Sequence, residues 1–322
     1  MWALVASAVA WAEPQATGTG APDEGKPRLE ATLLVDASQV KPGDTFRVGV
    51  RFRLDPDWYI YWKNPGDSGL STEVSWDAPG VTVGELRWPF PSTFRTPDGF
   101  IVSHGYKGET LLFAEARASE QATGSLMLSA AVDALVCAHR CIPAEVLLSR
   151  AVSVGAETVR DLETTAVFDA FQGQVPRPPE SMGHTVALKL EAQTLKTGQP
   201  FTGIVTVSAS DGKALSAVEP DFFVPERITG ITRMGLTLES PGRFHLKGDA
   251  APNAPKEPPR FKGVLRLGTA QTGYQAMEVD LPLAPVEVVP VAPKAPPTFA
   301  PVVPPAAATQ QEQRNDHGQQ HE

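Results

Sequence analysis

Hydrophobic and polar residues alternate with a period of two through most of the chain. From Leu29 onward, short alternating runs are separated by turns rich in Gly, Pro and Asp, and the clearest run is Phe-Arg-Val-Gly-Val-Arg-Phe at residues 46–52. This alternation is typical of a strand with one buried face. Further runs lie at residues 73–76, 81–88, 110–116, 126–136 and 145–154. Short strands separated by frequent turns predict a β-sandwich, which we assign to residues 29–156.

One segment departs from the two-residue period. Apolar residues recur at three- and four-residue steps between positions 157 and 172, and Gly173 follows them. This spacing predicts an amphipathic helix. A Pro-rich stretch at residues 175–179 then predicts a stiff linker, so that residues 157–182 form a helix and linker.

A second alternating pattern occupies residues 183–289 and predicts a second, smaller β-sandwich. The fold class expected for the chain is therefore all-β. Residues 290–308 are rich in Pro, Ala and Val, and residues 309–322 are rich in Gln. A segment of this composition cannot bury enough apolar surface to fold, so we expect residues 290–322 to be a disordered tail.

The N-terminal residues have the pattern of an export signal. Residues 1–12 form a short apolar run that ends in Ala-Trp-Ala, which fits the small-x-small rule for signal peptidase. No basic residue precedes the run, so we expect the natural start to lie upstream. Residues 13–28 are polar and rich in Gly and Pro, which predicts a flexible leader. No later stretch has the ~18–20 apolar residues of a transmembrane helix, so we expect a soluble, exported protein.

Composition and charge exclude several classes of protein. The 322 residues contain 27 Gly and 31 Pro, which would interrupt the long helices of a helical bundle. The formal net charge of -9 opposes nucleic-acid binding, because a phosphate backbone requires a basic face. No Ser/His/Asp set, phosphate-binding loop or pair of catalytic carboxylates stands out in the sequence.

The two cysteines, Cys137 and Cys141, are the main candidates for chemistry. In an extended strand their Cα atoms would lie ~13 Å apart. A disulfide tolerates about 7 Å at most. A bonded pair therefore requires a chain reversal, and we expect residues 138–140 to form a tight turn between two strands.

Three interpretations of this pair are open: a redox-active disulfide, an inert disulfide, and a metal site. Closing so small a loop stabilises the fold by only ~2 kcal/mol, which argues against a purely structural role. Arg140 is a fixed cation and His139 a potential one, and positive charge favours the reactive thiolate. Cys137, His139 and Cys141 would suit Cu(I), but a fourth ligand is not evident. The residues favour the redox interpretation and predict no bound cofactor or metal.

Four aromatic residues at positions 58–62 allow two further interpretations. They could form a platform for carbohydrate, or alternate residues could face the core, either Trp58, Ile60 and Trp62 or else Tyr59 and Tyr61. Strand alternation favours core packing, and Asn-Pro-Gly-Asp at residues 64–67 then forms a turn.

Four short motifs resemble the periplasmic N-terminal module of the DsbD/ScsB family of thiol:disulfide interchange proteins. In chain order, they are Tyr-Trp-Lys-Asn-Pro-Gly-Asp-Ser-Gly at 61–69, Trp-Pro-Phe-Pro at 88–91, Gly-Tyr-Lys-Gly-Glu at 105–109, and Leu-Val-Cys-x3-Cys-Ile-Pro at 135–143. The resemblance covers residues 30–180, and more faintly the second β region.

This resemblance implies an immunoglobulin-like sandwich that carries an exposed redox pair, Cys137 and Cys141. It implies that Cys141 forms mixed disulfides with partners, and that a short loop shields the pair, with Phe100 or Tyr106 as the shielding side chain. The implied partners are a thioredoxin-like electron donor or membrane reductase, and periplasmic proteins that contain disulfides.

The chain departs from the family at several positions. Tyr59, Ser103 and His104 replace residues common in the family, and the membrane and thioredoxin-like domains of full-length members are not found in this sequence. We therefore expect either that the electron donor is a separate protein or that the module has lost electron transfer. Two alternative functions remain open at this point: a non-catalytic binding module of two sandwiches with an inert disulfide, and a Cu(I)-handling protein, since the ScsB branch is associated with copper tolerance.

Overall fold

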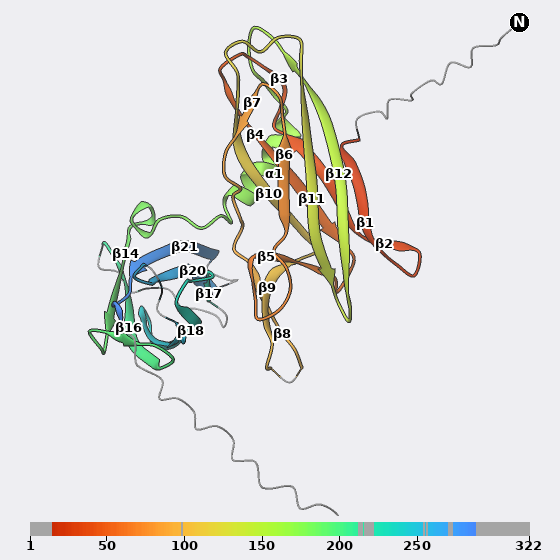
Figure 1. The fold of residues 1–322 in the computed structure, drawn as a ribbon. Coiled ribbons are helices and arrows are strands. Elements are labelled where there is room, and N and C mark those ends of the chain that lie inside the picture. The colour runs from red at the N-terminus through yellow and green to blue at the C-terminus, as the bar shows by residue number, and fades with distance from the viewer. Residues whose placement is uncertain are drawn as a thin grey trace, which may run out of the picture. The chain divides into compact units, whose positions relative to one another are not determined.

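A computed structural model describes residues 15–97, 99–211, 215, 222–253, 255, 257–269 and 273–287 (Figure 1). The predicted signal peptide at residues 1–12 and the predicted tail at 290–322 lie outside the described residues. Nearly all of the regular structure is β-strand, which confirms the all-β fold class. Among the described residues, no helix is long and apolar enough to cross a membrane.

The first β domain is a sandwich of two sheets. One sheet contains, in spatial order, β1 (Thr17–Asp23), β2 (Lys26–Val35), β4 (Thr45–Leu54), β10 (Glu109–Ala118) and β7 (Val81–Val83). The other contains β13 (Val159–Arg160), β3 (Ala37–Val40), β12 (Cys141–Val154), β11 (Ser125–Cys137), β5 (Tyr59–Gly66), β9 (Val102–Lys107) and β8 (Ser92–Arg95), with β6 (Glu73–Asp77) also paired to β11. The long antiparallel hairpin of β11 and β12 is the element that carries both cysteines (Figure 1).

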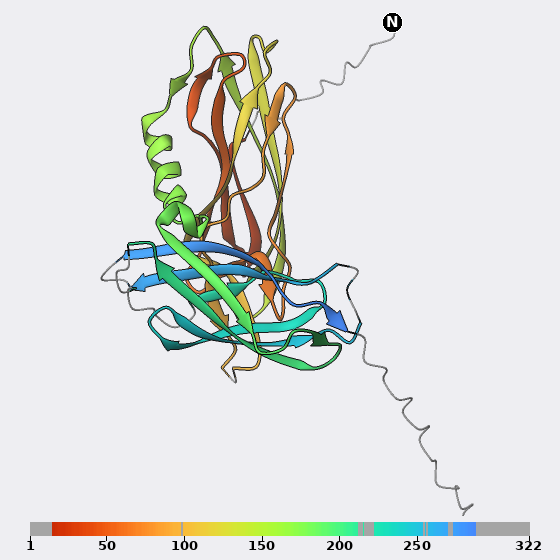
Figure 2. The same cartoon turned by 90° about the vertical axis from the view of Figure 1, so that its left-hand side faces the viewer.

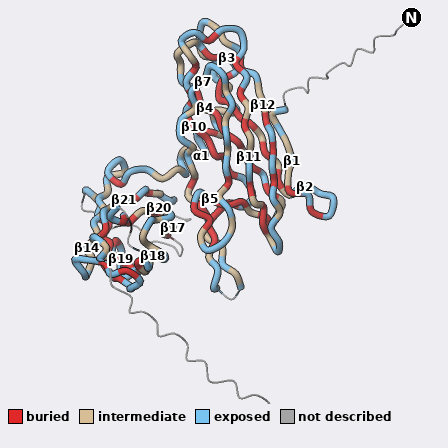
Figure 3. The backbone as a smooth tube through the Cα atoms, viewed as in Figure 1, coloured by how far each residue is buried: buried red, intermediate tan, exposed pale blue. Residues whose placement is uncertain are grey.

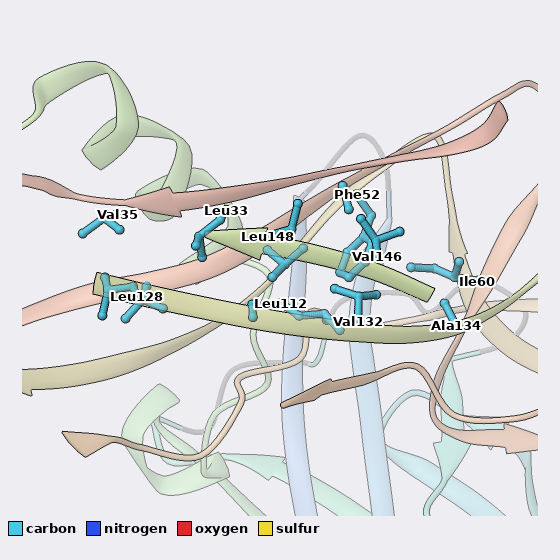
Figure 4. Packing of buried hydrophobic residues seen from close by; sticks show 14 of the residues in the cluster. Leu33, Val35, Phe52, Ile60, Leu112, Leu128, Val132, Ala134, Val146 and Leu148 are labelled. Atoms are coloured by element: carbon cyan, nitrogen blue, oxygen red, sulfur yellow. The ribbon is translucent and has the colours of Figure 1, made fainter. Parts of the chain in front are cut away.

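Alternate residues of both sheets point inward and form the core. Leu33, Phe52 and Leu112 come from one sheet and meet Val132 and Val146 from the other (Figure 4). Buried and exposed positions alternate along these strands (Figure 3). Burial of each large aliphatic side chain stabilises the fold by about 1.5–3 kcal/mol. The β-sandwich predicted from the two-residue period is what the structure shows, but it extends beyond residues 29–156 and includes β1 and β13.

The flexible leader predicted for residues 13–28 is wrong over most of its length. Residues Thr17–Asp23 form β1, which pairs with β2 in antiparallel register. Gly18 and Gly20 let this strand pass close to β12, because a Cβ atom at these positions would lie 2.5 Å from Val146 and 2.9 Å from Ala144. The glycines that resemble a linker in the sequence therefore serve close packing between strands.

The predicted helix is present but begins later than expected. Helix α1 spans Leu162–Gln172, and the side chain of Asp161 caps it by accepting a hydrogen bond from the Thr164 amide. The preceding residues Val159–Arg160 form β13 instead. Phe168 is the buried residue of α1 and packs edge-on against Phe113 of β10, with 5.6 Å between ring centroids. Figure 2 shows α1 along the outside of the sheet that contains β10.

The second β region consists of three smaller sheets within the described residues. One sheet contains, in spatial order, β14 (His184–Leu190), β16 (Pro200–Ala209), β19 (Arg243–Ala250) and β18 (Ile231–Ser240). Another sheet contains, in spatial order, β17 (Phe223–Pro225), β20 (Arg260–Thr269) and β21 (Gly273–Pro282). A two-stranded sheet pairs β15 (Leu195–Lys196) with β22 (Val286–Glu287), and a 3-10 turn, η1 (Pro179–Met182), precedes β14. Phe201, Phe244, Phe261, Leu265 and Met277 are among its buried core residues.

A buried carboxylate ties α1 and β13 to the first domain. The Asp36 side chain is 1% exposed and accepts hydrogen bonds from the backbone amide and Nε of Arg47, at 2.8 and 2.7 Å. It also accepts one from Arg160 of β13 at 2.6 Å. Arg47 in turn donates to Asp169 on α1 at 2.7 Å. Asp36 therefore links three elements through charge-assisted hydrogen bonds, which are the strong kind.

We predict that Asp36→Asn lowers the free energy of unfolding by about 2–3 kcal/mol, because hydrogen bonds between charged groups are replaced by weaker ones and Arg47 loses its counter-charge. Urea denaturation followed by circular dichroism measures this. Glu109→Gln is the matched control, since its partner Arg53 and Glu109 itself are both largely exposed, and it should cost less than about 1 kcal/mol. Equal losses for the two variants would contradict the role given to Asp36.

Candidate redox site

The cysteines lie opposite one another at the end of the β11–β12 hairpin. Their Cα atoms are 4.1 Å apart, and the two sulfurs form a disulfide. Residues 138–140 reverse the chain, with the Ala138 amide donating to the Arg140 carbonyl at 2.9 Å. The tight turn predicted from the cysteine spacing is therefore confirmed. Side chains along β11 and β12 point alternately toward the core and away from it. The two cysteines occupy outward positions, so the pair lies on the face of the hairpin that points away from the core.

The two sulfurs have different surroundings. Cys137 is fully buried, while Cys141 is exposed. The difference arises because Cys137 is paired with Cys141 on one side and with Tyr59 of β5 on the other. An incoming thiolate needs access to the sulfur that it attacks. Cys141 is therefore the accessible electrophile, and Cys137 is the sulfur that would leave.

The hydroxyl group of Tyr61 lies directly beside the disulfide. It donates to Cys137 Sγ at 3.3 Å and lies 4.0 Å from Cys141 Sγ and 3.5 Å from the hydroxyl of Tyr59. Burial raises the pKa of the Tyr61 phenol above its usual range, so the group stays neutral and can donate a hydrogen bond. A donor at this position would stabilise a thiolate formed on Cys137 when the disulfide opens.

Strand alternation in β5 delivers this tyrosine to the sulfurs. Trp58, Ile60 and Trp62 face the core, which is one of the two arrangements that the sequence allowed. Tyr59 and Tyr61 consequently face the cysteines. The Tyr59 ring packs against Phe94 of β8, with 4.6 Å between centroids. Tyr59, Tyr61 and Phe94 are not predicted as site residues from the sequence, because the pairing of β5 with β11 is a long-range contact that periodicity does not reveal.

The Asn-Pro-Gly-Asp-Ser-Gly motif holds Tyr61 in place. Gly69 lies against the Tyr61 ring, and a Cβ atom there would be 2.2 Å from Cζ of the phenol. Its φ angle of +101° also favours glycine. Asp67 fixes the other end of the loop, because its side chain accepts a hydrogen bond from the Val102 amide of β9 at 2.9 Å. The turn predicted for residues 64–67 is wrong in part, because residues 64–66 belong to β5, and the loop that follows them packs over the tyrosine that touches both sulfurs.

The two turn residues predicted to tune the thiol pKa have partners of their own. Arg140 forms an ion pair with Asp23, whose side chain is buried and also binds Arg28. The His139 ring meets the edge of Trp58, with 5.8 Å between centroids. Both residues therefore lie beside the pair, but the charge of Arg140 is largely offset. Their effect on the thiols stays a prediction.

The two predicted shielding residues lie at different depths. Tyr106 is buried opposite Ile60, and its hydroxyl donates to the Pro89 carbonyl at 2.7 Å, which anchors the Trp-Pro-Phe-Pro motif to β9. Phe100 is 83% exposed in the connection between β8 and β9. Tyr61 and Tyr59 lie beside the cysteines. A shielding role for Phe100 or Tyr106 stays a prediction.

Within the part of the chain that the structure describes, no group of three or more His, Cys, Asp or Glu residues is placed to hold a metal ion. The chemistry that the arrangement supports directly is thiol–disulfide exchange, because it combines an accessible sulfur, a buried leaving sulfur and a neutral hydrogen-bond donor.

Part of the chain is similar to known proteins. Residues 30–152 match the family model described as "Thiol:disulfide interchange protein DsbD, N-terminal". The fold is similar to the crystal structure of the N-terminal periplasmic domain of ScsB from Proteus mirabilis, with a TM-score of 0.57 and 14% identity, over 83% of this chain and 98% of that one. A cohesin module from a Clostridium perfringens glycoside hydrolase aligns with 16% identity over 39% of this chain and 95% of that one, with a TM-score of 0.27. No curated protein sequence matches the chain.

We predict that Tyr61→Phe slows reduction of the disulfide by dithiothreitol about 10- to 100-fold, because the leaving thiolate of Cys137 loses a hydrogen bond worth about 1.5–3 kcal/mol to a charged group. Stopped-flow fluorescence or timed alkylation measures the rate. Tyr106→Phe is the control, because it also removes a buried hydroxyl but one bonded to Pro89. If both variants react at the wild-type rate, Tyr61 has no role in exchange.

Proposed function

Since residues 30–152 match the family model of DsbD N-terminal domains, we propose that this chain is a periplasmic module that passes electrons through Cys137 and Cys141 by thiol–disulfide exchange. The observation that carries the proposal is the asymmetry of the pair. One sulfur is exposed at the end of a hairpin, and the other is buried with a hydroxyl donor beside it.

The first half of the cycle reduces the pair. A thiolate of the donor attacks Cys141 Sγ, the bond between Cys141 and Cys137 breaks, and Cys137 leaves as a thiolate that accepts the Tyr61 hydrogen bond. A second donor thiol then attacks the donor's own sulfur in the mixed disulfide and releases Cys141. The donor ends as a disulfide and the pair as a dithiol, with two electrons and two protons transferred.

The second half of the cycle returns the pair to its bonded state. The Cys141 thiolate attacks a disulfide of the client protein, and one client sulfur leaves as a thiolate. Cys137 then attacks Cys141 Sγ, which breaks the mixed disulfide and releases the second client thiol. The client gains the two electrons and two protons that the pair gives up.

The hairpin is suited to repeated opening of the bond. Closing the short loop contributes only ~2 kcal/mol to stability, so reduction leaves the fold intact. The register of β11 with β12 continues without a break from Cys137 to Ser125, and it holds the strands together when the sulfurs separate.

The partners follow from the same proposal. The donor would be a thioredoxin-like protein or a membrane reductase, and the clients would be periplasmic proteins that contain disulfides. The family resemblance and the similarity to a periplasmic domain of ScsB support export, as does the apolar pattern of residues 1–12.

We predict that the two single-cysteine variants differ in their capture of partners. Cys137→Ser keeps the exposed Cys141 and should form a mixed disulfide with an oxidised thioredoxin-like protein or with glutathione disulfide. Cys141→Ser keeps only the buried Cys137 and should form far less. Intact-mass spectrometry without reductant measures both adducts.

The double variant Cys137→Ser, Cys141→Ser serves as the blank for this comparison. Preferential capture by Cys137 would contradict the assignment of Cys141 as the attacking sulfur. No capture by either variant would contradict the proposed exchange activity itself.

A further inference from the structure

A groove lies on the outer face of the β11–β12 hairpin, beginning two residues along each strand from the disulfide. Because side chains alternate between faces, Leu135 and Asp133 follow Cys137 on the same face of β11. Pro143 and Glu145 follow Cys141 in the same way on β12. The register pairs Leu135 with Pro143 and Asp133 with Glu145. The outer face therefore presents the sulfurs first, then an apolar pair, then an acidic pair.

A hollow of about 510 Å³ lies against this series of residues. The opposite wall comes from the loop after β5, where Gly69 packs on Tyr61 and Leu70 is 67% exposed. Since Tyr61 contacts both sulfurs, the groove lies next to the redox site, separated from it by the Tyr61 ring. An exposed leucine facing an apolar pair is a surface suited to an apolar side chain of a ligand.

The far end of the groove is acidic. Glu73 of β6, Asp133 of β11 and Glu145 of β12 occupy adjacent positions across three paired strands, and all three are exposed. In the described part of the chain, none of the three forms an ion pair. Two cations also line the hollow, but Lys63 is bonded to Glu226 at 2.5 Å, which leaves Arg227. Three carboxylates against two cations, one of which is paired with Glu226, give this end a net negative charge.

We propose that the groove binds the stretch of a partner polypeptide that flanks the partner's reactive cysteine, and that it selects an extended segment with an apolar residue two positions from that cysteine and Lys or Arg four positions from it. An extended chain advances ~3.3 Å per residue and presents alternate residues to one face, which matches the spacing of the apolar and acidic pairs. This inference rests on the proposed exchange function, and it defines the partner segment that the same site recognises.

The test uses synthetic peptides in which one cysteine is linked to nitrothiobenzoate. The reduced protein attacks the peptide disulfide through Cys141, and nitrothiobenzoate leaves as a coloured thiolate. Cys137 then releases the peptide thiol and restores the disulfide of the protein. The peptides carry Leu two positions from cysteine and Lys, Gln or Glu four positions away, in both chain directions.

At low salt, the lysine peptide in at least one direction should react about 5- to 10-fold faster than the glutamate peptide, as expected for two or three exposed charge pairs. The difference should shrink at 1 M salt, where the Debye length is about 3 Å. Replacing the Leu of the peptide by Ser should slow the reaction as well.

A variant that lacks the three carboxylates of the groove tests whether they cause the preference for lysine. Glu73→Gln combined with Asp133→Asn and Glu145→Gln should abolish the preference for lysine. The matched control neutralises three acidic residues of the other sheet, with Glu30→Gln, Glu109→Gln and Glu115→Gln, and it should retain the preference. If lysine and glutamate peptides react equally with the wild type, or if the groove variant keeps the preference, the inference is wrong.

The reaction with free dithiobis(nitrobenzoate) separates this inference from the proposed function. Rapid reaction with this small disulfide together with no discrimination among peptides would overturn the groove and leave exchange intact. No reaction with either the small disulfide or the peptides would overturn the proposed function as well.

Discussion

Cys137 has two strand neighbours at once, Cys141 across the hairpin and Tyr59 on β5, and this pairing determines the rest of the site. Because both sides of Cys137 are covered, its sulfur is buried and Cys141 alone meets solvent. The same register brings Tyr61 to hydrogen-bonding distance of the buried sulfur. A single pattern of strand pairing thus supplies an accessible sulfur, a leaving sulfur and a donor for the charge that leaves with it.

The two faces of the β11–β12 hairpin divide stability from chemistry. The inner face packs against the other sheet through residues such as Val132 and Val146, while the outer face carries the sulfurs and the groove beside them. Opening the disulfide breaks one bond on the outer face and none of the apolar contacts on the inner one. Gly69 contributes at the boundary, since its missing side chain makes room for the Tyr61 ring. The scaffold can therefore remain fixed while the redox state changes.

Local sequence signals predicted the parts of this arrangement that depend on local geometry. The spacing of Cys137 and Cys141 predicted the turn, and the two-residue period predicted that one of two alternate sets of β5 residues enters the core, without deciding which set. Contacts between distant segments were not predictable in this way. Gly18 and Gly20 resembled a flexible leader because their function is close approach to β12, and Arg140 resembled a free cation because Asp23 lies far away along the chain. Tyr61 was missed for the same reason, since its role depends on the pairing of β5 with β11.

The reduction potential of the Cys137–Cys141 pair tests the central claim most directly. Equilibration in redox buffers of known potential, followed by alkylation and mass measurement, gives this value. An exchangeable pair should have a potential above about −300 mV, within reach of thioredoxin-like donors. A potential below about −300 mV is typical of structural disulfides that resist reduction, and it would contradict the account.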